Sequence, residues 1–284
     1  MILDDNVPFS SMNSKNKEKS PLLILGAPDA MTARICRDLG ADFIWASSFV
    51  LSSLLGSKDD GMVNINRYMP LIEGLIAASS APVILDFDIC GRNRKECIYQ
   101  LNKIKKLRLG GICIEDEGWP KVNAMLKSSL RRLVSPEKMA QKISTAKKTL
   151  NPGTFVIART HSLIAKENLL ELQNRINRYT RAGADILCMH YTGEKWDYYQ
   201  GIINKLRISK PLMVIFSKFN FVPGALDCSK IKYILFPNQI YRMMMRPVID
   251  FKNRQKKFSV RSVKFNPQKL IDIREIFNTF SKTC

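Results

Sequence analysis

Three carboxylates of this chain stand where two apolar segments end, and together they could hold a divalent cation. Asp86 and Asp88 end the segment Pro82–Asp88, and Glu115 ends the segment Gly110–Glu115. Carboxylates that converge repel one another unless a cation lies among them, and Mg²⁺ prefers oxygen ligands and keeps several waters. The sequence therefore predicts a Mg²⁺ site formed by these three residues.

Groups that could bind an anion lie at the ends of other apolar segments. Ser47 and Ser48 follow one of them, Arg159 lies near the end of another, and His190 ends a third. A guanidinium, hydroxyls and an imidazole can donate hydrogen bonds to a carboxylate or a phosphate group. Any one of these side chains could simply face solvent, but the whole set favours a binding site for a small anionic substrate.

The segment Gly56–Asn64, which reads Gly-Ser-Lys-Asp-Asp-Gly-Met-Val-Asn, contains two glycines around a Lys-Asp-Asp core. A glycine-flanked loop beside a binding site can act as a lid that excludes water. Composition alone fits an ordinary surface turn equally well, so the lid is a hypothesis.

Eight short apolar segments that alternate with helical segments must position these side chains. Most are continuously apolar, which is typical of strands buried on both faces of a parallel sheet. The intervening segment Lys166–Ala182 has apolar residues at steps of three and four, as an amphipathic helix does. The eight segments are Leu22–Ala27, Asp42–Ser47, Pro82–Asp88, Gly110–Glu115, Thr154–Thr160, Asp185–His190, Pro211–Ser217 and Lys232–Pro237.

Eight strand and helix repeats predict an α/β fold, a (β/α)8 TIM barrel; an open doubly wound sheet is the alternative. In a barrel, the active site lies at the C-terminal ends of the strands, where the residues named above would meet. We expect a flexible N-terminal arm at residues 1–20, a barrel catalytic domain at 21–253 and a C-terminal helical extension at 254–284. The extension would contain a helix near Pro267–Phe280.

The formal net charge of +20 raises the question of nucleic-acid binding. Lys and Arg are spread along the whole chain without an RNA-binding signature, so a basic surface is the simpler interpretation and nucleic acid is not an expected partner. No apolar run reaches the roughly 18 residues that a membrane span needs. Seven cysteines without CxxC pairs are typical of a reducing compartment, so we expect a cytoplasmic protein.

The chain resembles the isocitrate lyase/phosphoenolpyruvate mutase superfamily from about Leu25 to Asn238. Residues 29–34, Asp-Ala-Met-Thr-Ala-Arg, look like the D-A-x-S-A segment of that family, and the acidic strand ends at 86–88 and 115–116 are also similar. Lyases of the superfamily carry a K-x-C-G-H motif after the fourth strand. This chain instead resembles the mutase motif E-D-K-x-x-x-x-x-N-S, with Lys121 and Asn123 in register.

The resemblance implies a Mg²⁺-dependent mutase that interconverts phosphoenolpyruvate and 3-phosphonopyruvate. Asp86 would ligate the metal, while Asp88 and Glu115 would hold its waters. The family usually forms homo-oligomers, dimers or tetramers, with the C-terminal helix exchanged between subunits. The implied catalytic residues are Asp59, Lys121, Asn123, Arg159 and His190, and the implied substrate-binding residues are Trp45, Ser47, Ser48 and Phe49.

The chain departs from the mutase pattern at several positions beside the site. Glu117 replaces a lysine, Ala124 replaces a serine, Ser48 replaces a glycine, and His161 replaces an acidic residue. Two alternatives therefore remain open. One is a phosphonopyruvate hydrolase or a divergent 2-oxo-acid lyase or hydrolase of the same superfamily. The other is a barrel without catalytic activity that acts as a binding protein.

Overall fold

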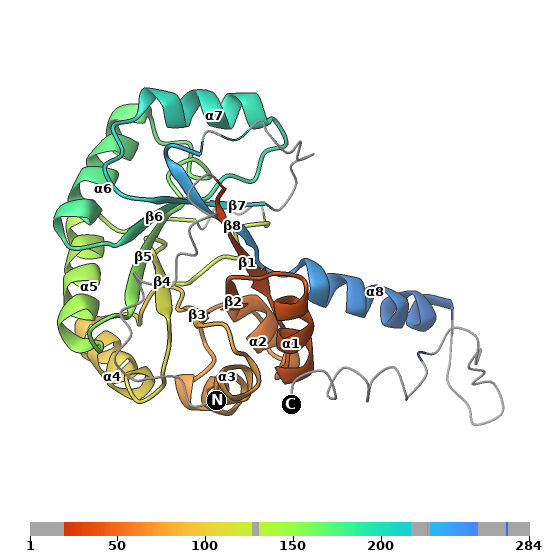
Figure 1. Cartoon of the computed structure of the whole chain (residues 1–284). Helices are drawn as coiled ribbons and strands as arrows, with labels where there is room; N and C mark the ends of the chain where they lie inside the picture. Colours follow the sequence, from red (N-terminus) through yellow and green to blue (C-terminus); the bar gives the residue numbers. More distant parts are fainter. Residues whose placement is uncertain (1–19, 127–130, 217–225, 227, 255–270, 272–284) are drawn as a thin grey trace.

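The computed structural model describes residues 20–126, 131–216, 226, 228–254 and 271. Eight parallel strands pair in sequence order and close into a barrel, which confirms the predicted (β/α)8 fold. Figure 1 shows the helices arranged around this sheet. The strands are β1 (Leu22–Gly26), β2 (Phe43–Ala46), β3 (Val83–Asp86), β4 (Gly111–Glu115), β5 (Phe155–Thr160), β6 (Ile186–Met189), β7 (Leu212–Ile215) and β8 (Ile231–Phe236).

Most of the described helices have an N-cap residue whose side chain accepts a backbone hydrogen bond. The side chains of Asp29, Asn93 and Ser135 accept hydrogen bonds from backbone N–H groups in the first turns of α1, α4 and α5, which would otherwise lack partners. The described helices are α1 (Ala30–Asp38), α2 (Ser48–Leu54), α3 (Ile65–Ala78), α4 (Arg94–Ile104), α5 (Pro136–Thr149), α6 (Leu169–Arg181), α7 (Trp196–Lys205) and α8 (Gln239–Arg254).

Two apolar layers hold the barrel together. The larger layer fills the space between the strands and the surrounding helices. The smaller one fills the inside of the barrel and includes Ile24, Trp45, Ile157 and Leu235. Because side chains alternate between the two faces of each strand, the sheet needs apolar residues at nearly every position. This double burial explains why the sequence shows continuous apolar segments.

The barrel closes where β1 pairs with β8, with Leu25 opposite Phe236. A Cβ atom built on Gly26 would lie 1.9 Å from the carbonyl oxygen of Pro237, so only glycine allows this close approach. The seam therefore depends on a residue without a side chain.

The helical prediction for Lys166–Ala182 is confirmed for most of its length, because α6 spans Leu169–Arg181 and Asn168 caps it. Leu172 and Ile176 are buried as expected, but Leu169 is 39% exposed. Leu169 is the first residue of α6, and its side chain is not covered by the sheet as those of Leu172 and Ile176 are.

Helix α8 projects away from the barrel in Figure 1 and carries exposed apolar residues, among them Met243 and Val248. The predicted N-terminal arm, residues 1–20, lies outside the described residues except for Ser20. The predicted extension 254–284 also lies outside them except for Arg254 and Ile271. Among the described helices, none is long and apolar enough to cross a membrane.

Candidate active site

A cavity of about 70 Å³ lies at the C-terminal rim of the barrel. Strand ends and the loops after them supply its walls, as in other barrels of this kind. Most of the residues that the sequence predicts for the site line this cavity: Ser47, Ser48, Phe49, Asp59, Asp86, Glu115, Lys121, Asn123, Arg159 and His190. Side chains that lie up to 143 residues apart in the chain thus meet in one place.

Two predicted residues do not line the cavity. Trp45 is fully buried in the apolar layer inside the barrel, and its indole Nε1 finds no hydrogen-bond partner in the part of the chain that the structure describes. Asp88 lines a neighbouring small cavity together with Asp86. It has a φ of 49°, in the left-handed region that few residues other than glycine adopt. Asp88 contacts the residues of the cavity through Lys121, whose Nζ atom lies 2.6 Å from Asp88 Oδ1.

Arg159 lies between the carboxylates of Asp86 and Glu115. Its Nη2 atom is 3.0 Å from Asp86 Oδ1 and donates a hydrogen bond to Glu115 Oε2. Burial raises the pKa of Asp86. Burial also acts to raise the pKa of Glu115, but the neighbouring Arg159, His161 and Lys121 together lower it. Glu115 is thus held as a carboxylate in a site closed to water.

The carboxylates of Asp86 and Glu115 can accept more hydrogen bonds than Arg159 donates to them. Asp86 Oδ1 and Glu115 Oε1 are buried and accept no hydrogen bond among the described residues. A buried carboxylate oxygen that accepts no hydrogen bond is costly, and Asp86 Oδ1 has only the ion-pair contact with Arg159 at 3.0 Å. A hard cation with its waters would satisfy both oxygens. The donor set therefore fits a Mg²⁺ ion.

The three predicted metal ligands do not converge as tightly as a direct three-carboxylate site would need. In the described part of the chain, the group of ligand atoms within 4.8 Å of one another comes from Glu115, Glu117 and His161. Asp86 and Asp88 are not in it. The assignment of Asp86 as the metal ligand, with Asp88 and Glu115 holding the waters of the ion, therefore stays a prediction.

Lys121 connects the lid segment to the metal site. Its Nζ atom lies 2.5 Å from Asp59 Oδ1 and 2.6 Å from Asp88 Oδ1, and it donates a hydrogen bond to Ser48 Oγ at 3.2 Å. Asn123 Nδ2 donates to the other oxygen of Asp59 at 2.7 Å. The segment Gly56–Asn64 therefore lies closed over the cavity.

The charges around Lys121 depend on one another. Burial opposes its positive charge, but the carboxylates of Asp88 and Asp59 raise the pKa of Lys121 above its usual value. Burial raises the pKa of Asp88 to about 8, although Lys121 acts against this shift. An anion or a metal ion that entered the site would change this balance, because each group is within reach of the other's charge.

Two histidines connect the cavity to a cluster of residues behind it. His190 Nδ1 lies 3.2 Å from His161 Nε2, and His161 Nδ1 lies 3.0 Å from Glu117 Oε2. Arg131 Nη1 donates to the same oxygen of Glu117 at 2.9 Å. Burial lowers the pKa of His190, and the neighbouring His161 and Arg159 lower it further, so His190 is a neutral imidazole at pH 7.

Sequence reasoning identified Glu117 and His161 only as departures from the family pattern, and the structure shows that these two departures contact each other. Arg131 was missed, because it lies in a long loop with no local signal. A carboxylate and an imidazole thus meet where the mutase pattern has a lysine and an acidic residue.

Asp116 is a second residue that sequence reasoning left without a role. It is fully buried and accepts hydrogen bonds from Thr160 Oγ1 at 2.6 Å, from the backbone N–H of His161 at 2.9 Å and from Tyr179 OH at 2.7 Å. Arg175 Nη1 lies 3.3 Å away. Asp116 thus fixes the end of β5, which carries Arg159, and its role is structural.

A sequence model described as phosphoenolpyruvate phosphomutase matches residues 13–253. The chain belongs to this family. A phosphoenolpyruvate phosphomutase of Tetrahymena pyriformis is 24% identical over 208 residues, which are 73% of this chain and 69% of the relative. Other curated relatives are 2-methylisocitrate lyase, 2,3-dimethylmalate lyase and phosphonopyruvate hydrolase. The family is one of enzymes, and its members catalyse more than one reaction.

Solved structures share the fold. The phosphoenolpyruvate phosphomutase of Streptomyces platensis subsp. rosaceus superposes with a TM-score of 0.81 at 21% identity, covering 93% of this chain and 91% of that chain. A phosphonopyruvate hydrolase in complex with oxalate and Mg²⁺ gives a TM-score of 0.77 at 21% identity, covering 94% and 92%. At this identity the likeness shows the fold alone.

Proposed function

We propose that the protein is a Mg²⁺-dependent phosphoenolpyruvate mutase that interconverts phosphoenolpyruvate and 3-phosphonopyruvate. The observation that carries the proposal is the contact of Asp59, in the predicted lid, with both Lys121 and Asn123, in the cavity that Asp86 and Glu115 also line. The described residues that line the cavity include no cysteine, which the carbon–carbon lyases of the superfamily would require.

Asp86 would ligate the metal ion, and Asp88 and Glu115 would hold its waters. A bound Mg²⁺ would supply Lewis-acid stabilisation for the negative charge that develops on the pyruvyl oxygens. The hydrolase structure that contains oxalate and Mg²⁺ supports this choice of cofactor by analogy of fold. The proposed substrate is a small anionic 2-oxo or enolpyruvate acid.

The protein's own residues would bind and isolate the substrate. Arg159, Ser48 and His190 line the cavity and would donate hydrogen bonds to the carboxylate and phosphoryl oxygens. Lys121 would neutralise part of the phosphoryl charge. Phosphoryl transfer has a loose transition state, so positioning and charge provide most of the catalysis. Asn123 and the closed lid would keep water from the phosphoryl group.

Hydrolysis of phosphonopyruvate is the second candidate function. The same metal site would serve it if a water molecule reached the phosphoryl group. Ala124 lines the cavity and places a methyl group where the mutase motif has a hydroxyl, so the wall next to Asn123 differs from that of the mutases. A homo-oligomer is also proposed, because α8 exposes apolar side chains that another subunit could cover.

Phosphorus NMR distinguishes these functions. The full-length protein is incubated with 3-phosphonopyruvate and Mg²⁺, and the products are followed over time. We expect a signal of phosphoenolpyruvate. Phosphate with pyruvate would indicate the hydrolase instead. If neither product forms at any metal concentration, both functions are wrong. The variant Asp86→Asn, prepared in the same way, is the control for turnover by a contaminating enzyme.

A further inference from the structure

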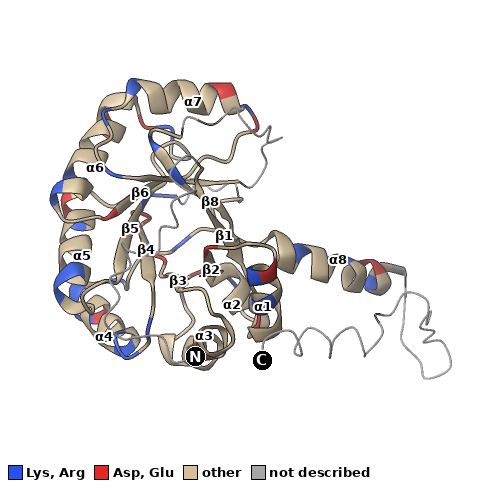
Figure 2. Ribbon diagram, in the orientation of Figure 1, with Lys and Arg blue, Asp and Glu red and all other residues tan. Residues whose placement is uncertain are grey.

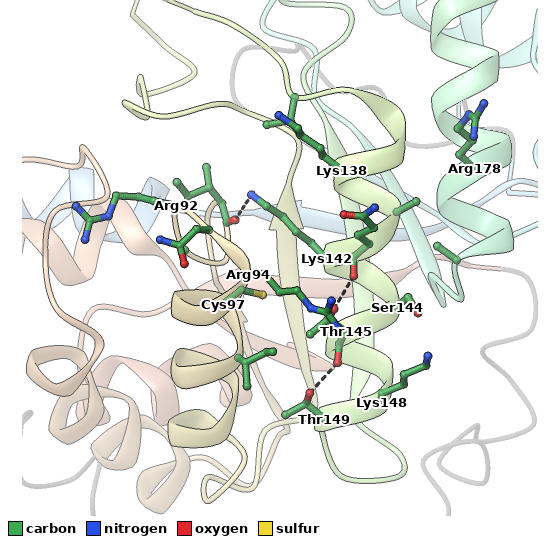
Figure 3. A pocket seen from close by; sticks show the side chains of 18 of the residues that line it. Arg92, Arg94, Cys97, Lys138, Lys142, Ser144, Thr145, Lys148, Thr149 and Arg178 are labelled. Carbon is green, nitrogen blue, oxygen red and sulfur yellow. Dashed lines mark hydrogen bonds between the residues drawn. The ribbon is translucent and has the colours of Figure 1, made fainter.

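A groove of about 1150 Å³ lies on the outer face of the barrel, outside the cavity described above, and one end of it reaches loops beside that cavity. It runs between α4 and α5, from the loop after β3 to the last turns of α5 and α6 (Figure 3). In Figure 2, blue segments on the ribbons of these helices mark positions of Lys and Arg. Its lining holds one carboxylate, Glu117, and seven cationic side chains: Arg92, Arg94, Lys138, Lys142, Lys148, Arg178 and Arg181.

Most of this positive charge is not balanced by nearby carboxylates. Arg92 pairs with Glu96 at 2.9 Å and Arg178 pairs with Glu137 at 3.0 Å, while Glu117 is turned toward Arg131. No described carboxylate forms an ion pair with the remaining five, which are Arg94, Lys138, Lys142, Lys148 and Arg181. Cations that share one concave surface repel each other and focus a positive potential there, so the groove attracts anions.

Lys142 is the cation placed deepest in the groove. Its Nζ atom donates a hydrogen bond to the backbone carbonyl of Ile89 at 2.5 Å, and Figure 3 shows the side chain reaching from α5 toward the loop after β3. An ammonium group has three donors, and this carbonyl is the only acceptor found for it among the described residues. Because burial lowers the pKa of Lys142, its charged form lacks stabilisation that a bound anion would provide.

We propose that this groove binds a small molecule that carries a chain of linked phosphates, with one phosphate on Lys142 and the others on the neighbouring cations. Lys138 and Lys142 are one helical turn apart, about 6 Å along the axis of α5, a spacing that linked phosphates can span. Small-molecule pockets have volumes of about 300–1,000 Å³, so the groove can hold more than a single phosphate ion.

Inorganic tripolyphosphate and nucleoside triphosphates share this chemistry. A nucleic-acid backbone is a poorer match, because Lys142 lies in the depth of the groove between two helices and a ligand must enter to reach it. The site is separate from the proposed reaction, and binding can be measured without turnover. Failure of one proposal therefore leaves the other standing.

The end of the groove that Ile89 and Trp119 line contacts two loops at the C-terminal rim of the barrel. Ile89 directly follows Asp88, so Lys142 holds the loop that carries this carboxylate. Trp119 lines the groove, carries the guanidinium of Arg92 at 5.3 Å from its ring centre, and packs against Gly61 of the lid. A ligand bound at this end changes the surroundings of Trp119, so its fluorescence is expected to report binding.

The test is a calorimetric titration of tripolyphosphate into the full-length protein in dilute salt, repeated at about 150 mM salt. Arg94→Ala and Lys138→Ala remove exposed cations from the groove, and each is expected to weaken binding about tenfold. Lys142→Met is expected to weaken it more. Lys95→Ala removes a cation from α4 that does not line the groove, and binding should stay within about twofold of wild type.

The comparison with Lys95 decides the outcome. If Lys95→Ala weakens binding as much as Arg94→Ala does, the anion responds only to the net charge, and the site does not exist. Absence of measurable binding by the wild-type protein would overturn the proposal equally. Since Lys142→Met could disturb the loop at Ile89, the two exposed variants carry the test if this one fails to fold.

Two further ligands identify the source of the phosphates. Adenosine triphosphate that binds more tightly than tripolyphosphate and quenches Trp119 fluorescence would indicate a nucleotide. Equal affinities would indicate that the phosphate chain alone is recognised, and both results support the proposal. A single-stranded oligonucleotide that binds tightly and is not displaced by tripolyphosphate would overturn it, because the groove would then belong to a nucleic-acid surface.

Discussion

Replacing Asp59 by alanine should open the lid while leaving the barrel intact. The Asp59 side chain is 8% exposed and binds Lys121 Nζ at 2.5 Å and Asn123 Nδ2 at 2.7 Å. In Asp59→Ala both contacts disappear, but Lys121 keeps its ion pair with Asp88 and is not left without a partner. The cost therefore falls on closure of the lid and not on the folding of the whole chain.

The size of the effect follows from the two contacts. Hydrogen bonds that involve a charged group contribute about 1.5–3 kcal/mol each, and water replaces part of this when the lid opens. A loss of about 3 kcal/mol in closure corresponds to roughly a hundredfold rise in the open fraction, at tenfold per 1.4 kcal/mol. Turnover that requires the closed lid should fall by a similar factor, while the free energy of global unfolding changes little.

Limited proteolysis of the segment Gly56–Asn64 measures opening without any assumption about the reaction, because cleavage follows the population of the open form. Asp60→Ala is the matched control. Asp60 is the adjacent residue, and from the described residues its side chain accepts a hydrogen bond only from the backbone N–H of Met62. If Asp59→Ala is cleaved no faster than Asp60→Ala and keeps full turnover, the contacts of Asp59 do not hold the lid and the reasoning is wrong.

Three further outcomes are expected. Asp86→Asn removes the charge of the proposed metal ligand without changing its shape, so calorimetry should show Mg²⁺ affinity reduced by about tenfold or more. Asp116→Asn replaces a carboxylate that faces four hydrogen-bond donors by an amide that accepts less well. Urea denaturation should show that the free energy of unfolding falls by about 3–5 kcal/mol. Gly26→Ala pushes a methyl group against Pro237, and the strain should lower the stability by at least about 1–3 kcal/mol in the same assay.

Most strands were predictable because they are buried on both faces and therefore read as short, continuously apolar segments, whereas β1 and β8 at the seam are only partly buried. Seven of the eight predicted segments contain an observed strand, β8 begins one residue before the eighth segment, and no end differs by more than two residues. The site was predictable for the same reason. Since parallel strands place their carboxyl ends on one rim, polar residues such as Asp86 and Glu115 had to meet there once the barrel was assumed.

Other features depend on contacts that no local pattern reveals. Which way the Trp45 side chain points depends on the register of β2 in the closed sheet, and the structure turns it into the barrel interior. Arg131 contacts Glu117 from a loop 14 residues away. The basic groove is a similar case, because Arg94, Lys142 and Arg178 look scattered in the sequence until three helices bring them onto one surface.

The pairing of β1 with β8 has a consequence for the way the protein is made. Leu25 and Phe236 are partners across the seam, so the barrel cannot close until β8 has left the ribosome, more than 200 residues after β1. Until then the growing sheet has two open edges with unpaired backbone groups, and such edges favour aggregation. Contacts this distant in sequence also form slowly. We therefore expect expression at low temperature, which slows synthesis and association, to increase the yield of the folded protein.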